Sequence, residues 1–169
     1  MTNDLQKRVI FGAIALAIFT PFLLAGGMAF QFFVGLLAMI ATAELIKMRR
    51  LAPNSIEGVL AMLASLVLTL PLQNYLTFLP TDGNYTAYAI VVFLLLGATV
   101  FNIGRYNYSD VVFPIASSFY VGIGFHSLVL ARMDGLNKVF FALCLVWATD
   151  IGAYMIGRQF GSRKLIPKV

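Results

Sequence analysis

The sequence predicts an all-α fold, a polytopic membrane helical bundle with about six transmembrane helices. Of the 169 residues, 60% are hydrophobic and only 11% are charged, whereas a soluble domain is about half apolar and about a quarter charged. A membrane-spanning helix needs about 20 apolar residues to cross about 30 Å of hydrocarbon, so the chain has room for six. The apolar runs are continuous and do not alternate with polar residues, which excludes a transmembrane β-barrel. We therefore expect residues 1–169 to form a single transmembrane domain.

Turn-forming and polar residues divide the chain into six apolar segments. We expect helices over residues 9–24, 28–46, from about 55 to 70, 85–103, 111–130 and from 137 to about 157. The sequence Ala25-Gly26-Gly27 predicts a tight connection, so that the first two helices form a hairpin. A signal peptide has a similar charged start and apolar core, but here a second apolar run resumes at once.

Capping residues predict where three of these helices begin. The expected caps are Asn54 for the third helix, Ser109 or Asp110 for the fifth and Asn137 for the sixth. Glu57 follows Asn54 at the spacing of a capping box, in which it would return a hydrogen bond to the amide of the cap. Pro114 is expected in the first turn of its helix, where a missing amide costs little.

The distribution of cations predicts the orientation in the membrane, because cytoplasmic loops are enriched in Lys and Arg. With a cytoplasmic amino terminus, two cations lie outside, Arg132 and Lys138, and ten lie inside: Lys7, Arg8, Lys47, Arg49, Arg50, Arg105, Arg158, Arg163, Lys164 and Lys168. This asymmetry accounts for the net charge of +5. We therefore expect a multi-pass protein of the cell membrane and no nucleic-acid partner.

Asp150 is the polar residue that most needs an explanation, because it falls inside the sixth apolar segment. A charged side chain near the bilayer centre costs about 2.5–3.5 kcal/mol, so it is retained where it faces a cavity, a partner charge or a metal. On a helix, Asp150, Tyr154, Gly157 and Gly161 form one stripe, and Gly157 and Gly161 have the spacing that lets helices approach closely. The alternative is an ion pair between Asp150 and a neighbouring helix.

The other polar residues in the apolar segments have simpler interpretations. Glu44 lies three residues before Lys47, a spacing that favours a local ion pair. His126 has no second ligand at metal-binding spacing, which favours packing between helices. Cys144 is the single cysteine and is also expected to pack.

The last part of the chain resembles a known family. It reads Trp147-Ala-Thr-Asp-Ile-Gly-Ala-Tyr-Met-Ile-Gly-Arg-Gln-Phe-Gly-Ser-Arg-Lys-Leu-Ile-Pro-Lys-Val169. It is similar to the central segment of the phosphatidate cytidylyltransferases, in which a Thr-Asp-x-x-Ala-Tyr helix precedes a Gly-Lys-x-Lys-Leu-x-Pro-like loop. The cation that often follows the loop glycine stands one place later here, at Arg163. The start of the chain, a hairpin ending in Glu44-Leu45 and basic residues, is also similar to that family.

The resemblance implies transfer of a cytidylyl group from CTP to phosphatidate, giving CDP-diacylglycerol and pyrophosphate, with Mg²⁺ as cofactor. Asp150 would be the catalytic residue and metal ligand, and Tyr154, Arg163, Lys164 and Lys168 would bind the substrates. The expected partners are CTP and phosphatidate in the membrane, with a homodimer as an option.

The family continues beyond the segment that is matched here with a polar loop, further helices and a Lys- and Asp-rich signature. The chain is therefore expected to be the amino-terminal part of a longer enzyme, to which any activity would belong. Two other functions remain open from the residues: a CTP-dependent polyprenol kinase, and a non-enzymatic transporter or scaffold in which Asp150 pairs helices.

Overall fold

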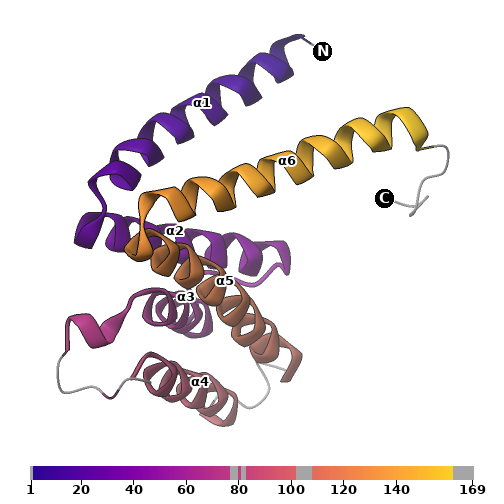
Figure 1. The fold of residues 1–169 in the computed structure, drawn as a ribbon. Helices are drawn as coiled ribbons and strands as arrows, with labels where there is room; N and C mark the ends of the chain where they lie inside the picture. The colour runs from indigo at the N-terminus through magenta and orange to yellow at the C-terminus, as the bar shows by residue number, and fades with distance from the viewer. Residues whose placement is uncertain (1, 77–79, 81–82, 102–107, 162–169) are drawn as a thin grey trace.

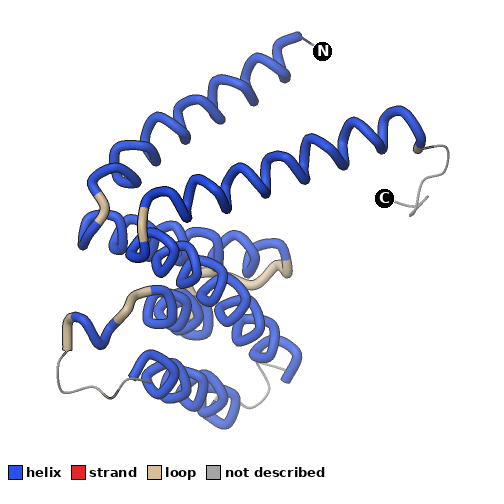
Figure 2. The backbone as a smooth tube through the Cα atoms, in the orientation of Figure 1, coloured by secondary structure: helices blue, strands red, loops and turns tan. Residues whose placement is uncertain are grey.

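The computed structural model describes residues 2–76, 80, 83–101 and 108–161. Within these ranges the protein consists of helices and connecting turns and contains no strand (Figures 1 and 2). The helices are α1 (Thr2–Ala25), α2 (Gly27–Met48), α3 (Ile56–Thr69), the short 3-10 helix η1 (Leu72–Asn74), α4 (Gly83–Phe101), α5 (Tyr108–Asp134) and α6 (Leu136–Phe160). The predicted all-α bundle is confirmed.

The helices differ in how well they match the thickness of a membrane. Among the described residues, three stretches are long and apolar enough to cross a bilayer: Gly27–Met48, Asp110–Asp134 and Leu136–Gln159. Three shorter apolar helices accompany them, Ile10–Ala25, Ile56–Thr69 and Gly83–Gly97. Each of the six predicted apolar segments therefore forms a helix, although three of those helices are short for a span.

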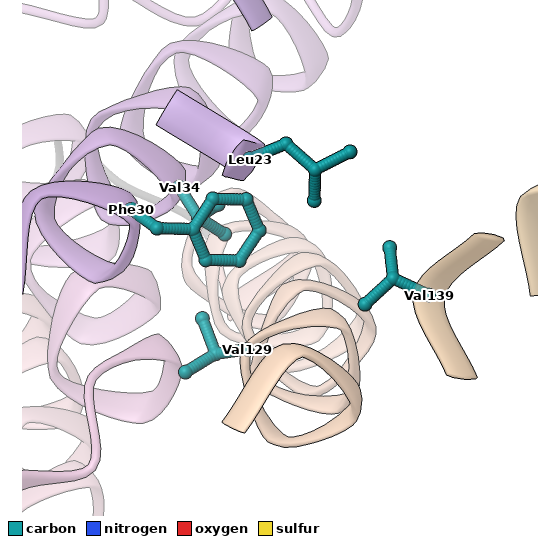
Figure 3. Packing of buried hydrophobic residues seen from close by; sticks show 5 residues of the cluster. All are labelled: Leu23, Phe30, Val34, Val129 and Val139. Atoms are coloured by element: carbon teal, nitrogen blue, oxygen red, sulfur yellow. The ribbon is translucent and has the colours of Figure 1, made fainter. Parts of the chain in front are cut away.

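The bundle is built around α3, which packs against α2, α4 and α5, and α2 also packs against α5. In contrast, α1 and α6 leave the bundle at one end and extend away from it (Figure 1). A small apolar cluster joins their bases to the bundle. It consists of Leu23, Phe30, Val34, Val129 and Val139, whose side chains converge from α1, α2, α5 and α6 (Figure 3).

Burial differs sharply between the three long apolar stretches. Inside the protein, 39% of the α2 window and 33% of the α5 window are buried, but only 6% of the α6 window. The helix that carries Asp150 is therefore the least covered of the three.

Glycine permits the sharp turns at the two helices that project from the bundle. Gly26 has φ 64° and Gly27 has φ 54°, which places both in the left-handed region and confirms the tight first connection. Gly135, with φ 148°, separates α5 from α6. Beside Gly26, the guanidinium of Arg132 occupies the space that a Cβ would need. A larger residue at position 26 would therefore displace Arg132.

Arg132 connects α1 to α5 through the main chain. Its Nε donates to the carbonyl oxygen of Leu23 at 2.7 Å and its Nη2 to that of Leu24 at 3.1 Å. These are carbonyls of the last turn of α1, which lack partners within the helix and carry partial negative charge. Arg132, which entered the sequence analysis only as an outside cation, thus caps α1.

Polar contacts hold α3, α4 and α5 together. The Tyr88 hydroxyl donates to the carbonyl oxygen of Ile115 at 3.0 Å and lies 3.2 Å from Ser118 Oγ. His126 Nδ1 lies 3.1 Å from the carbonyl oxygen of Thr69, which confirms its role in helix packing. Each such contact between membrane helices contributes about 0.6 kcal/mol, with a maximum near 1.7 kcal/mol.

The predicted starts of three helices are wrong. Ser55, not Asn54, caps α3, since its Oγ accepts from the Gly58 amide at 3.1 Å. Both are good capping residues, and the side chain of Glu57 is buried instead of returning to the cap. Helix α5 already begins at Tyr108, so Pro114 lies past the first turn. Helix α6 begins at Leu136, before Asn137, because Gly135 makes the turn.

Candidate functional site

Asp150 lies in the second half of α6 and is exposed. Among the described residues, no hydrogen bond or ion pair reaches its carboxylate. The neighbouring Thr149 directs its hydroxyl to the carbonyl oxygen of Leu145 at 2.7 Å and so does not contact Asp150. The ion pair that a helix-pairing role would need is thus not formed within the described part of the chain.

Tyr154 lies one turn after Asp150 on the same helical face, and 69% of its surface is exposed. Gly157 follows on this face with no atom within 4 Å of the position of a Cβ. Gly161 departs from the prediction, because α6 ends at Phe160 and Gly161 is its extended C-cap, with φ −72° and ψ 92°. The exposed face therefore contains Asp150, Tyr154 and Gly157, and Gly161 instead ends the helix.

The C-cap itself requires glycine. The amide of Gly161 donates to the carbonyl oxygen of Gly157 at 3.0 Å, and a Cβ on Gly161 would overlap that oxygen. This close approach leaves no room for a side chain at position 161. Arg158 is exposed in the last turn, where a cation also complements the helix dipole. The predicted phosphate-binding residues Arg163, Lys164 and Lys168 lie outside the described residues.

The described residues contain no group of three or more His, Cys, Asp or Glu side chains that could enclose a metal ion. This result is compatible with Mg²⁺, which usually keeps several waters and is held by one or two carboxylates together with substrate phosphates. An exposed carboxylate such as Asp150 has the hard oxygen ligands that this mode requires. Asp150 therefore fits Mg²⁺ as one of several ligands, not as a complete site.

Two of the simpler interpretations can be judged directly. Lys47 Nζ lies 2.8 Å from Glu44 Oε1, which confirms the local ion pair. Cys144 is exposed on α6, so its predicted packing role is wrong within the described part of the chain. The error follows from the isolated position of α6, which an apolar sequence pattern does not reveal.

Two features were missed by the sequence analysis. The first is the burial of Glu57, which is 3% exposed and, among the described residues, has no hydrogen-bond partner at either carboxylate oxygen. It borders a cavity of about 140 Å³ that Arg50 and Asp110 also line. The second is a groove of about 650 Å³ between α2 and α5. Neither has a local sequence signal, because both depend on which helices pack together.

The long apolar helices and their arrangement define an integral membrane protein of the helical type. Residues 6–169 match the sequence model of the cytidylyltransferase family, and the chain belongs to that family. It is 38% identical over 165 residues to a phosphatidate cytidylyltransferase of Staphylococcus saprophyticus and 36% identical to that of Staphylococcus haemolyticus. It is 33% identical to a phosphatidate cytidylyltransferase of Staphylococcus aureus. No solved structure matches the chain.

The alignments cover a larger share of this chain than of its relatives. They include 98% of this chain but 63% of the length of each of these relatives. The family resemblance stated from the sequence is confirmed along nearly the whole chain, including the amino-terminal helices.

Proposed function

We propose that the full-length protein transfers a cytidylyl group from CTP to phosphatidate, and that residues 1–169 are the amino-terminal part of this enzyme. The observation that carries the proposal is Asp150, an exposed carboxylate without a partner among the described residues, on the least buried apolar helix. Membership of the cytidylyltransferase family and the names of the relatives support the reaction.

In this reaction an oxygen of the phosphatidate phosphate attacks the α-phosphorus of CTP, and the bond from the α-phosphorus to the bridging oxygen breaks. CDP-diacylglycerol forms and pyrophosphate leaves. Mg²⁺, when bound, would neutralise negative charge on the triphosphate. Asp150 would hold the ion through its carboxylate oxygens, and the phenol of Tyr154 would hydrogen-bond to a substrate oxygen.

The cations after Asp150 suit the substrates. Arg158 lies about 12 Å further along the axis of α6 at about 1.5 Å per residue, toward the end of the helix. Arg163, Lys164 and Lys168 follow in the sequence. Arg and Lys bind phosphate oxygens through charge-assisted hydrogen bonds. We assign phosphate binding to these three residues, at a level of the membrane that both a soluble nucleotide and a lipid headgroup reach.

The same proposal includes an orientation. The amino terminus and the Asp150 end of α6 would face the cytoplasm of the cell, where CTP is made, in accordance with the cation asymmetry. A homodimer belongs to the proposal as well, because α1 and α6 leave apolar surface that a second copy could cover.

The test is Asp150→Asn in the full-length protein, which keeps the size of the side chain and removes its charge. Turnover should fall by at least about 100-fold, since loss of a preorganised electrostatic group costs about 2.7–4 kcal/mol. Thermal stability should be unchanged or higher, because the cost of inserting a charge of about 2.5–3.5 kcal/mol disappears. Asp134→Asn is the control, since Asp134 is exposed at the end of α5 and pairs with Lys138.

Two labels separate the reactions. With CTP labelled at the α-phosphate, cytidylyl transfer moves the label into lipid, whereas a polyprenol kinase transfers only a γ-phosphate label. A full-length Asp150→Asn variant that loses stability but keeps turnover would show that Asp150 pairs helices and does not hold the metal.

A further inference from the structure

The cavity of about 140 Å³ at the start of α3 is bordered by two acidic residues from different helices. Glu57 comes from the first turn of α3 and Asp110 from the first turn of α5, and these two helices pack against each other. One water molecule takes up about 30 Å³ in the liquid, so a cavity of this volume holds several. It therefore has room for a small ion that keeps part of its water shell.

Glu57 is the residue that most requires a ligand. It is 3% exposed, and in the described part of the chain neither carboxylate oxygen has a hydrogen-bond partner. Buried charges in proteins are paired or coordinate metals, because an unpaired charge is costly to remove from water. The dipole of α3 favours the negative charge only weakly by comparison. A cation bound at Glu57 would remove the cost of its burial.

Asp110 can supply the second ligand. It is partly buried and makes a contact of its own. A carboxylate has about four acceptor positions, so this contact leaves Asp110 able to ligate an ion as well. The charges of Glu57 and Asp110 together balance one divalent cation.

Arg50 also borders the cavity but does not neutralise Glu57. Arg50 is exposed, and among the described residues no ion pair joins it to Glu57. Its backbone has φ 62°, and its amide donates to the carbonyl oxygen of Lys47 at 2.8 Å. The Leu51 amide donates to the carbonyl oxygen of Ile46 at 3.2 Å, which completes a Schellman turn. The turn after α2 thus forms a wall of the cavity and leaves the two acids without a cation between them.

We propose that this cavity binds one Mg²⁺ ion, held by Glu57, Asp110 and water, and that the ion ties the start of α3 to the start of α5. Mg²⁺ usually keeps several waters and is bound through one or two carboxylates, which matches two acids in a cavity of this volume. This mode needs no group of three metal-binding side chains, and the described residues contain none.

The ion site is separate from Asp150 and does not depend on the proposed reaction. Helices α3 and α5 belong to the bundle, whereas α6, which carries Asp150, extends away from it (Figure 1). An ion at Glu57 and Asp110 would therefore stabilise the bundle and would not contact the reacting groups.

The test uses the full-length protein with Asp150→Asn as a background, so that the proposed catalytic ligand does not contribute. Mn²⁺ replaces Mg²⁺, and the decrease of its free-ion electron paramagnetic resonance signal measures binding. Glu57→Gln and Asp110→Asn should each weaken one site by at least about ten-fold, the smaller loss seen when only an outer-shell partner of a metal is removed. Glu44→Gln is the matched control, because Glu44 is exposed, pairs with Lys47 and does not border the cavity. It should bind Mn²⁺ as the background does.

Thermal unfolding of the same proteins gives a second measurement. In EDTA, Glu57→Gln should be more stable than the background, because a buried amide costs less than an unpaired carboxylate. Added Mg²⁺ should raise the unfolding midpoint of the background, because a ligand that binds only the folded state stabilises it increasingly with concentration. The rise should be smaller in Glu57→Gln and in Asp110→Asn, but not in Glu44→Gln.

Two results would overturn the site. One is equal Mn²⁺ affinity in the background, Glu57→Gln and Asp110→Asn, and the other is a midpoint that rises equally with Mg²⁺ in all three. The two substitutions lie on different helices, so misfolding of one variant leaves the other as a test. Failure of the proposed reaction is distinguishable: a full-length protein that binds Mn²⁺ at Glu57 but forms no CDP-diacylglycerol refutes only the reaction.

Discussion

Glu57, at the amino-terminal end of α3, is 3% exposed, and within the part of the chain that the structure describes neither of its carboxylate oxygens has a hydrogen-bond partner. The helix dipole favours a negative charge there by about 0.3–1 kcal/mol. Burial of an unpaired charge opposes this by several kcal/mol. The balance predicts that Glu57 lowers the stability of the fold.

Glu57→Gln should therefore raise the free energy of unfolding by about 1–3 kcal/mol, because an amide of the same shape costs less to bury than a carboxylate. Thermal unfolding in detergent with EDTA measures the change. Glu44→Gln is the control, since Glu44 is exposed and pairs with Lys47. A loss of stability in Glu57→Gln would mean that a cation or a donor outside the described residues meets the carboxylate.

Single residues illustrate what sequence could and could not predict. Asp150 was identifiable because a charge in an apolar run is costly wherever the helix lies. The burial of Glu57 could not be predicted, because it depends on whether Asn54 or Ser55 caps α3. Asn54 and Ser55 are both suitable caps, and the choice of Ser55 brings Gly58 so close to the main chain at Pro53 that a Cβ would overlap the Pro53 carbonyl. That contact is local, but it follows from the backbone path before α3, which both candidate caps allow.

At the scale of elements, α1 depends on a few contacts at its carboxyl end. Leu23 joins the apolar cluster, and Arg132 donates hydrogen bonds to the carbonyl oxygens of Leu23 and Leu24. The outer part of α1 is exposed from Ile10 to Leu16. Its position relative to the bundle is therefore set by one end only.

Arg132→Ala should release α1 from α5 and lower the free energy of unfolding by about 1.5–3 kcal/mol, the usual contribution of a hydrogen bond to a charged group. Proteolysis between α1 and α2 should become faster, which a structural change confined to α5 would not produce. Lys138→Ala, which breaks only the exposed pair with Asp134, should change stability by less than about 1 kcal/mol. Equal effects of the two substitutions would contradict the capping role.

The existence of the helices was predictable, because each apolar run is long enough to demand main-chain hydrogen bonding within itself. The residues at which the helices begin were harder to predict. The early start of α6 follows from the conformation of Gly135, and the early start of α5 places Pro114 inside the helix. At α6 the turn is set by the backbone conformation of Gly135, for which the sequence offered several compatible residues.

At the scale of the whole molecule, α3 lies at the centre and α6 lies outside the bundle, with 6% of its apolar window buried. The sequence did not indicate this order, since the helices are similarly apolar and their pairing depends on matching surfaces. It also could not indicate the groove between α2 and α5, which exists only because these two helices are neighbours.

The orientation predicts opposite sides for two connections. Ala52→Cys, in the exposed loop after α2, should be protected from a membrane-impermeant maleimide in intact cells, whereas Gln73→Cys, exposed in η1, should react. Both should react after the membrane is made permeable. Asn84 is a poor position for such a label, because it is buried and its side chain bonds to the main chain at Leu70 and Leu72. Labelling of both cysteines from outside would refute the proposed topology.

Because the chain spans 63% of the length of its relatives, we expect residues 1–169 alone to be inactive. Residues 1–169 alone should produce no CDP-diacylglycerol in vesicles with CTP and Mg²⁺, since the described part contains one exposed acid on α6 and no group of three or more metal-binding side chains. The full-length protein in the same vesicles is the positive control. Turnover by the segment above the level of its own Asp150→Asn variant would show that the site is complete without further residues.

The isolation of α6 has a consequence for biosynthesis. A ribosome releases this helix into the bilayer while Asp150 has no protein partner among the helices made before it. The translocon must then accept a carboxylate at a cost of about 2.5–3.5 kcal/mol, which the many apolar residues of α6 can offset. Slow insertion is therefore expected at this point of translation, and Asp150→Asn should shorten the delay in a force-sensing arrest-peptide assay.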